Sequence, residues 1–152
     1  TDGSIPANGT MWQTGTVWWD VAGVVDRATG FATNRLEIDL GSLYSLTGVG
    51  LSFDNNDVYS FFTRASSSEA WTWWADTFCS ACGDGMVYGG FPGFSAGMPV
   101  SARYLAITAY NGDGYYSVGE IEAYTAADVP EPAALGLLSL GLAGVAARRR
   151  RA

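Results

Sequence analysis

The sequence contains no histidine and no lysine, and only two cysteines among its 152 residues. Histidine is the usual general base of enzymes and a frequent metal ligand, so the common nucleophile–base pairs and zinc sites lack their parts. Carboxylate pairs remain as the main catalytic resource, which leaves glycoside hydrolysis open. The composition therefore favours a binding or structural protein over an enzyme.

Positive charge is also scarce over most of the chain. Residues 1–127 hold 13 acidic residues and four arginines, a net charge near −9. Nucleic acids and anionic lipids are both polyanions, so neither is expected as a partner. The chain begins at Thr1 rather than Met, and we expect it to be a mature form or a fragment whose export signal lay upstream.

The C-terminal end combines three features in order. The motif Pro130-Glu131-Pro132 precedes an uncharged apolar run at residues 133–147, and a basic end follows, made of Arg148, Arg149, Arg150 and Arg151. As a helix the apolar run would span roughly 22 Å, short of the ~30 Å bilayer core. It is therefore a marginal membrane anchor, with the arginines on the cytoplasmic side, and a buried helix of a soluble domain is the alternative.

This three-part tail resembles the PEP-CTERM sorting signal of Gram-negative bacteria. The resemblance implies an exosortase-type processing enzyme as partner and anchoring in the inner membrane through the helix before processing. It also implies export to the cell surface or the extracellular matrix. We accordingly divide the chain into a domain at residues 1–127 and a sorting signal at residues 128–152, which is left out of fold reasoning.

Before residue 133 the sequence shows β-strand patterns and no helical period. Leu36, Ile38 and Leu40 alternate with polar residues at 35–40, and residues 48–53 alternate likewise. Gly, Asn, Asp and Ser mark turns between the runs. Further strands are expected at 58–64, 70–75, 102–109 and 116–124, whereas residues 77–100 are expected to be irregular. An antiparallel β-sandwich or jelly roll follows.

Three motifs in this order resemble the discoidin family, also called coagulation factor type C domains. They are Ile38-Asp39-Leu40-Gly41, then Ala102-Arg103-Tyr104-Leu105 with Ile107, then the run from Tyr116 to Glu122, YSVGEIE. The resemblance implies an all-β, antiparallel jelly-roll β-sandwich of the galactose-binding-like type, here followed by a C-terminal hydrophobic helix. It also implies a binding module that recognises sugars or surface ligands through loops at one end.

Many bacterial members of that family carry a structural calcium ion. Matched residue by residue, the family pattern makes calcium ligands of Asp2, Thr16 and one of Glu120 or Glu122. Calcium needs six to eight oxygens, including backbone carbonyls. The alternative is a solvated Asp-Gly turn with two glutamates on one face of an edge strand.

Polar turn residues supply candidate ligand contacts. The run Asp54, Asn55, Asn56 and Asp57 directly follows a strand and reads as a plain turn, a second cation site or a contact to sugar hydroxyls. The loop Asn111-Gly112-Asp113-Gly114 reads in the same ways, and Tyr115 follows it.

Six tryptophans favour carbohydrate, because sugar rings stack their C–H faces on aromatic rings. Trp18-Trp19 and Trp73-Trp74 are adjacent pairs, and neighbours in a strand point to opposite faces, so one of each pair can be exposed. We take Trp19 and Trp74 as candidates, although core packing is the ordinary fate of a single tryptophan.

Cys79 and Cys82 form a C-x-x-C in a stretch rich in Gly and Ser. A local disulfide is the leading interpretation in an exported protein, and a redox dithiol or a zinc site are alternatives that lack their usual partners here. Together these patterns predict an exported module that binds carbohydrate such as exopolysaccharide. The alternative is a structural matrix or adhesin protein without a defined sugar.

Overall fold

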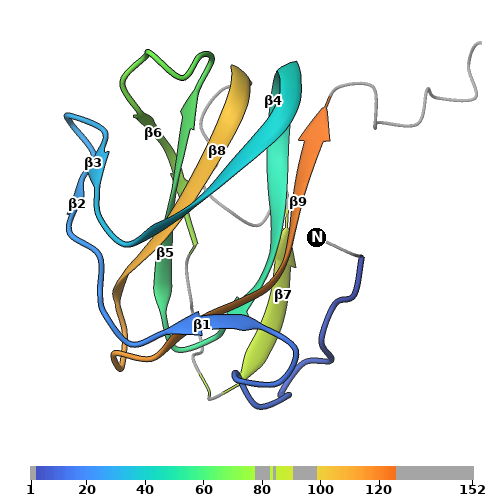
Figure 1. Cartoon of the computed structure of the whole chain (residues 1–152). Helices are drawn as coiled ribbons and strands as arrows, with labels where there is room; N and C mark the ends of the chain where they lie inside the picture. The colour runs from blue at the N-terminus through green and yellow to red at the C-terminus, as the bar shows by residue number, and fades with distance from the viewer. Residues whose placement is uncertain (1–2, 78–82, 84, 91–98, 126–152) are drawn as a thin grey trace, which may run out of the picture.

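The computed structural model describes residues 3–77, 83, 85–90 and 99–125. All regular structure in this part is β-strand, as Figure 1 shows. The strands are β1 (Val17–Trp19), β2 (Val25–Asp26), β3 (Phe31–Ala32), β4 (Arg35–Asp54), β5 (Val58–Arg64), β6 (Thr72–Asp76), β7 (Met86–Gly90), β8 (Val100–Asn111) and β9 (Tyr116–Thr125). Within the described residues no helix is long and apolar enough to cross a membrane. The helix predicted at residues 133–147 lies outside them.

Strand β4 is 20 residues long and takes part in both layers of the fold. Its first half pairs with β8, and its second half pairs with β9 on one side and β7 on the other. The first layer is therefore the first half of β4 with β8, β5 and β6, and the second layer is β7, the second half of β4, β9 and β1. All these pairs are antiparallel. Figure 1 shows β4 crossing the molecule and turning down beside β9.

The bend in β4 corrects one sequence prediction, because the runs at 35–40 and 48–53 were expected to be separate strands. The pairing of β4 with β8 shifts register between Asp39 and Tyr44. Gly41 sits in the bend with φ 82°, and its N–H donates to Asp39 Oδ1 at 2.8 Å. The glycine that looked like a turn thus carries a bulge, which lets one strand pass from layer to layer.

The core lies between the two layers. Val49, Leu51 and Phe53 of β4 pack from the second layer against residues of the first, including Phe61 and Ile107, and all five are at most 3% exposed. The residues of β4 between them are buried too, Ser52 at 0%, so this half of β4 is covered on both faces rather than half-buried as its alternation suggested. The prediction of an all-β antiparallel β-sandwich is confirmed.

Other strand predictions differ in detail. The strands expected at 58–64, 70–75, 102–109 and 116–124 correspond to β5, β6, β8 and β9, with bounds shifted by up to two residues. Residues 77–100 were expected to be irregular, yet β7 lies within them and pairs with the end of β4. Strands β1, β2 and β3 are only two or three residues long, too short for an alternating pattern to reveal.

The N-terminal segment, residues 3–16, lies against the second layer. The N–H of Gly9 donates to the carbonyl of Met86 at 2.8 Å, and the N–H of Met86 donates to the carbonyl of Thr10 at 2.8 Å. Pro6 packs so closely on Gly119 that an added Cβ there would lie 2.9 Å from the proline ring. These contacts bring the segment, with Trp12 in it, to the end of the sandwich where β4 turns into β5.

Candidate functional site

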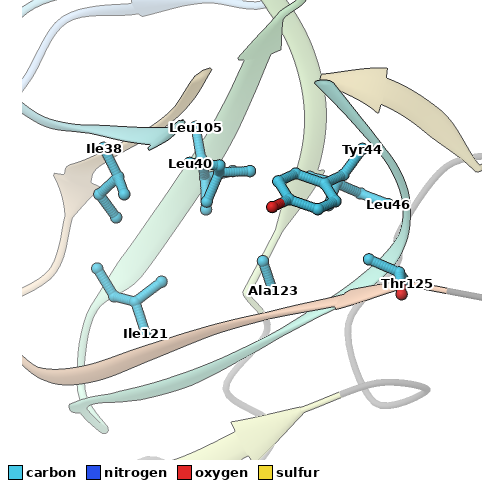
Figure 2. Close-up of a pocket in the computed structure, with 8 residues that line it drawn as sticks. All are labelled: Ile38, Leu40, Tyr44, Leu46, Leu105, Ile121, Ala123 and Thr125. Atoms are coloured by element: carbon cyan, nitrogen blue, oxygen red, sulfur yellow. The ribbon is translucent and has the colours of Figure 1, made fainter. Parts of the chain in front are cut away.

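The described residues form several hollows, and two of them lie at opposite ends of the sandwich. The first is a pocket of about 300 Å³ near the end of β9. Figure 2 shows its lining, which is Ile38, Leu40, Tyr44, Leu46, Leu105, Ile121, Ala123 and Thr125. The tyrosine and threonine hydroxyls are the polar groups among these side chains, and no lining residue is charged. A specific ligand site needs several convergent polar groups, so this pocket is a weak candidate.

The second hollow, which we call the acidic cleft, has a volume of about 460 Å³. It lies between the N-terminal segment, the turn from β4 to β5, the start of β7 and the loop from β8 to β9. Its lining residues are Gly9, Met11, Trp12, Asp54, Asn56, Gly85 and Asp113. Carboxylate, amide and aromatic side chains meet here, which makes this the candidate site.

The turn from β4 to β5 forms the floor of the cleft. The N–H of Asp57 donates to the carbonyl of Asp54 at 3.3 Å, and the N–H of Asn55 donates to the carbonyl of Gly85 at 3.1 Å. Asp54 and Asp57 are only 1% and 0% exposed. The four residues therefore form a turn, as one interpretation of the sequence had it, but two of its carboxyl groups are buried rather than solvated.

Asp57 is held beneath the loop from β8 to β9. The hydroxyl of Tyr59 donates to Asp57 Oδ2 at 3.2 Å and also bonds the backbone of Ser117. Gly112 lies directly over the carboxyl group, since an added Cβ would come within 1.8 Å of Asp57 Oδ1. Burial, and after it the charges of Asp54 and Asp113, raise the pKa of Asp57 to about 7. The buried carboxyl group of Asp57 is therefore partly neutral near pH 7, whereas Asp113 is the exposed carboxylate at the cleft.

Asp113 connects the two loops that frame the cleft. Its Oδ1 accepts the N–H of Tyr115 at 2.8 Å, and its Oδ2 accepts Asn56 Nδ2 at 3.0 Å. The side chain is exposed. A carboxylate has about four lone-pair sites, so Asp113 can still accept hydrogen bonds from a ligand while these two contacts fix its position.

An aromatic platform stands beside the cleft and consists of Trp12, Trp18 and Tyr115. The rings of Trp12 and Tyr115 stack with centroids 5.6 Å apart and planes at 29°. Trp18 meets Trp12 edge to face at 5.3 Å. Trp18 and Tyr115 are 49% and 51% exposed. Large exposed rings gathered in one place are typical of an interaction surface.

The structure brings together some of the residues singled out in the sequence. Asp54, Asn56 and Tyr115 lie at the cleft or its platform, with Asp57 beneath and Asn55 at the back of the turn. The two tryptophan candidates lie elsewhere. Trp74 is 4% exposed in the core, so its ring offers no surface to a ligand.

Trp19 packs inward against Tyr59 and Tyr116, with centroids 6.2 and 6.0 Å away. Neighbours do point to opposite faces, but the exposed member of the first pair is Trp18. Trp12 was missed because it follows no strand pattern. Its place among Gly, Thr and Asn, where no alternation would bury it, is the signal that could have found it.

The predicted calcium ligands are only partly gathered. Glu120 Oε2 accepts the N–H of Gly3 at 2.9 Å, which places the N-terminal segment beside the glutamate, but Asp2 lies outside the described residues. Thr16 donates its hydroxyl to the carbonyl of Trp12, and Glu122 accepts hydroxyls of Tyr88 and Tyr124. Among the described residues no three acidic or other metal-binding side chains form a group able to hold a metal ion. Calcium stays a prediction.

Two other sets of sequence predictions fall outside the described part of the chain. They are Cys79 with Cys82, and the tail residues Pro130, Glu131, Pro132 and Arg148 to Arg151.

Comparison with known proteins identifies the tail. Residues 128–151 match the family model of the PEP-CTERM protein-sorting motif. The chain therefore ends in a sorting signal of this kind. No curated protein matches the sequence.

Solved structures similar to this chain include carbohydrate-binding modules. The CBM32 of AlyQ in complex with 4,5-unsaturated mannuronic acid is 17% identical with a TM-score of 0.49, and 72% of this chain covers 76% of it. CBM32-1 from a family 31 glycoside hydrolase of Clostridium perfringens is 13% identical with a TM-score of 0.45, and 78% of this chain covers 99% of it.

A GH29 fucosidase of Ruminococcus gnavus in complex with fucose is 19% identical with a TM-score of 0.43, and 60% of this chain covers 17% of that enzyme. At TM-scores below 0.5 these likenesses carry no argument about this chain, and what those proteins bind does not carry over to it.

Proposed function

We propose that this chain is an exported carbohydrate-binding module, sorted through its PEP-CTERM signal, that holds a glycan at the acidic cleft. The observation that carries the proposal is the stack of half-buried Trp12 and exposed Tyr115 at a cleft lined by Asp113 and Asn56. A sugar ring presents C–H groups on its face and hydroxyls on its rim. The platform suits the face, and the carboxylate and amide suit the rim.

The polar groups of the cleft are already fixed. The bond between Asn56 Nδ2 and Asp113 Oδ2 joins the two framing loops, and Tyr59 ties Asp57 to the backbone of Ser117 below them. A site whose groups are held in place loses little conformational entropy when a ligand binds. This supports recognition of a defined glycan over nonspecific adhesion.

The sorting signal supports the destination we propose. We infer that an exosortase-type enzyme of a Gram-negative bacterium processes the tail near residues 130–132, where the PEP-CTERM motif lies. In this proposal the helix at residues 133–147 holds the chain in the inner membrane before processing. The module then acts at the cell surface or in the extracellular matrix, where exopolysaccharide is the available glycan.

A structural matrix or adhesin protein is the second candidate. Val17, Val21 and Val24 are 58%, 58% and 63% exposed near β1, and apolar surface of this kind suits contacts with another protein. In that case the chain would associate with protein partners and recognise no particular sugar.

The test is binding of the purified full chain to an array of neutral, amino and acidic glycans, with calcium and again with a chelator. We expect saturable binding that falls by about 10-fold or more in Trp12→Ala and by less in Tyr115→Ala, because each stacked ring contributes on the order of 1 kcal/mol or more. Tyr44→Ala is the matched control, since Tyr44 is 43% exposed at the opposite end. A folded chain that binds no glycan would overturn the proposal in favour of the structural alternative.

The same samples test catalysis. We expect bound glycans to keep their length during prolonged incubation, as for a binding module. Shortened glycan, produced by the wild type and not by a variant lacking one carboxylate of the cleft, would instead show a hydrolase.

A further inference from the structure

Three carboxyl groups gather at the acidic cleft on two levels, and this decides which glycans it suits. Asp54 and Asp113 line it, and Asp57 lies directly beneath. Asp57 has no exposed surface, and the hydroxyl of Tyr59 donates to its Oδ2 atom at 3.2 Å. The carboxyl groups of Asp54 and Asp113 repel that of Asp57. The pKa of Asp57 is raised mainly by burial and secondly by these two charges.

The positive charges of the described residues are engaged elsewhere. Arg27 pairs with Asp76 at 2.9 Å and Arg103 with Asp39 at 2.7 Å. Arg35 and Arg64 both pair with Glu37, at 2.6 and 3.5 Å. The groups that Asp113 is bonded to, the amide of Asn56 and the N–H of Tyr115, are neutral donors. The charge of the cleft is therefore not balanced by the arginines of the described part of the chain.

The apolar walls of the cleft strengthen the electrostatic potential that its carboxylates produce. Met11 and Trp12 line one side and contribute no ionic group. A cleft with one sign of charge and low-dielectric walls attracts ligands of the opposite sign, and the faces of aromatic rings favour cations too. An anionic sugar would meet repulsion here, and a neutral sugar would gain nothing from the charge.

We propose that the glycan bound at this site carries free amino groups, so that a protonated amino sugar stacks on the aromatic platform with its ammonium group at Asp113. This inference rests on the proposed function and specifies its ligand class. Asp113 is the exposed carboxylate at the cleft, and its two hydrogen bonds leave lone pairs for an ammonium donor. The buried carboxyl groups of Asp54 and Asp57 lie beneath it.

The test compares two oligosaccharides of equal length, a β-1,4 glucosamine tetramer and its fully N-acetylated counterpart. They have the same rings and linkages and differ in charge at the 2-amino groups. Titration calorimetry with the full chain at low salt, at a pH where the amines are protonated, should show at least about 10-fold tighter binding of the free-amine tetramer, as expected for one close charge pair. The difference should shrink as salt is added.

Two variants assign the effect to the cleft. Asp113→Asn should remove most of the preference, since its amide can still accept the N–H of Tyr115 but carries no charge. Asp39→Asn is the matched control, because it removes one exposed carboxylate at a distance from the cleft and changes the net charge equally. It should leave the preference unchanged.

The outcomes separate the two proposals. Equal binding of both tetramers, lost in Trp12→Ala, would overturn the amino-sugar inference and leave a carbohydrate-binding module. An equal fall of the preference in Asp113→Asn and Asp39→Asn would also overturn it, because the net charge of the domain would then be responsible. Absence of binding to either tetramer and to every neutral or acidic glycan would overturn both proposals.

Discussion

Aromatic rings and charged side chains lie together on two surfaces of this molecule. On one surface they pack the sheet, and on the other they are available to a ligand. On the outer face of the first layer, which we call the arginine face, Arg35 and Arg64 lie 5.2 and 4.2 Å from the ring of Trp71. Arg64 and Arg103 lie 4.9 and 5.2 Å from the ring of Tyr104. Both surfaces would look alike as a list of residue types.

The two surfaces differ in how far their charges are balanced and how far their rings are buried. On the arginine face each arginine has a carboxylate partner, and Trp71 is only 8% exposed, packed with Phe62 and Ala106. At the acidic cleft the rings of Trp18 and Tyr115 are about half exposed, and the carboxyl groups face one another. The arginine face completes the packing of the sheet, whereas the cleft leaves rings and charge available to a ligand.

The largest effect is expected at the centre of the arginine face. Trp71→Ala should lower the free energy of unfolding by about 3–5 kcal/mol, because it removes a buried ring and the surface on which two arginines stack. Urea denaturation measures this. Trp18→Ala is the control and should cost about 1 kcal/mol or less, since its ring is half exposed. A small loss for Trp71→Ala would mean that the arginine face is not structural, and Trp71→Phe gives a milder variant should alanine prevent folding.

A smaller effect should follow from the charge buried under the cleft. The pKa of Asp57 is about 7 in the folded chain, raised by burial and by neighbouring carboxylates, against an ordinary value of 3.8. The folded state therefore binds the proton more tightly, and stability is lost as the pH rises from about 4 through 7. Asp57→Asn should remove this loss, making the variant more stable than the wild type at pH 8 by on the order of 2 kcal/mol.

Denaturation at pH 5 and pH 8 checks this difference. Asp39→Asn is the control, because Arg103 lowers the pKa of Asp39 to about 2 and leaves that group ionised throughout this range. It should show the same pH dependence as the wild type. A pH dependence that persists in Asp57→Asn would contradict the buried charge.

The smallest effect is expected for Arg103→Gln. The pair of Arg103 with Asp39 is bidentate, with bonds of 2.7 and 2.8 Å, but both side chains are exposed. Exposed pairs contribute little because water screens them. Neither the thermal midpoint nor glycan binding should change beyond measurement error. Loss of glycan binding in this variant would mean that the arginine face belongs to the site.

Much of the fold could be predicted from local patterns. Turn residues on either side identified the β-rich runs of β5, β8 and β9 with bounds shifted by no more than two residues. Alternation identified the runs at 35–40 and 48–53, both of which belong to β4. The same alternation could not show that residues 35–54 form one bent strand, since Gly41 reads equally as a turn and as a bulge. Strand β7 was not predicted because the glycines in and around it are typical of loops.

The candidate site was less predictable. Asp54, Asn56 and Tyr115 were found because turn residues after strands are conspicuous, but Trp19 and Trp74 were preferred over Trp12 and Trp18. Which member of an adjacent pair faces the core depends on the register with neighbouring strands. That register is set by pairs such as Trp18 with Ser117, which are 99 residues apart in the chain.

By itself the sequence determined the sorting signal at residues 128–151, the all-β class and the negative charge, because each depends on residue order or composition alone. Only the tertiary structure decided that Trp12, Asn56 and Asp113 share one cleft while the four arginines of the described residues pair with carboxylates elsewhere. The reason is physical: long-range strand pairing places turns from distant parts of the chain side by side. Exposure and charge balance are properties of that arrangement.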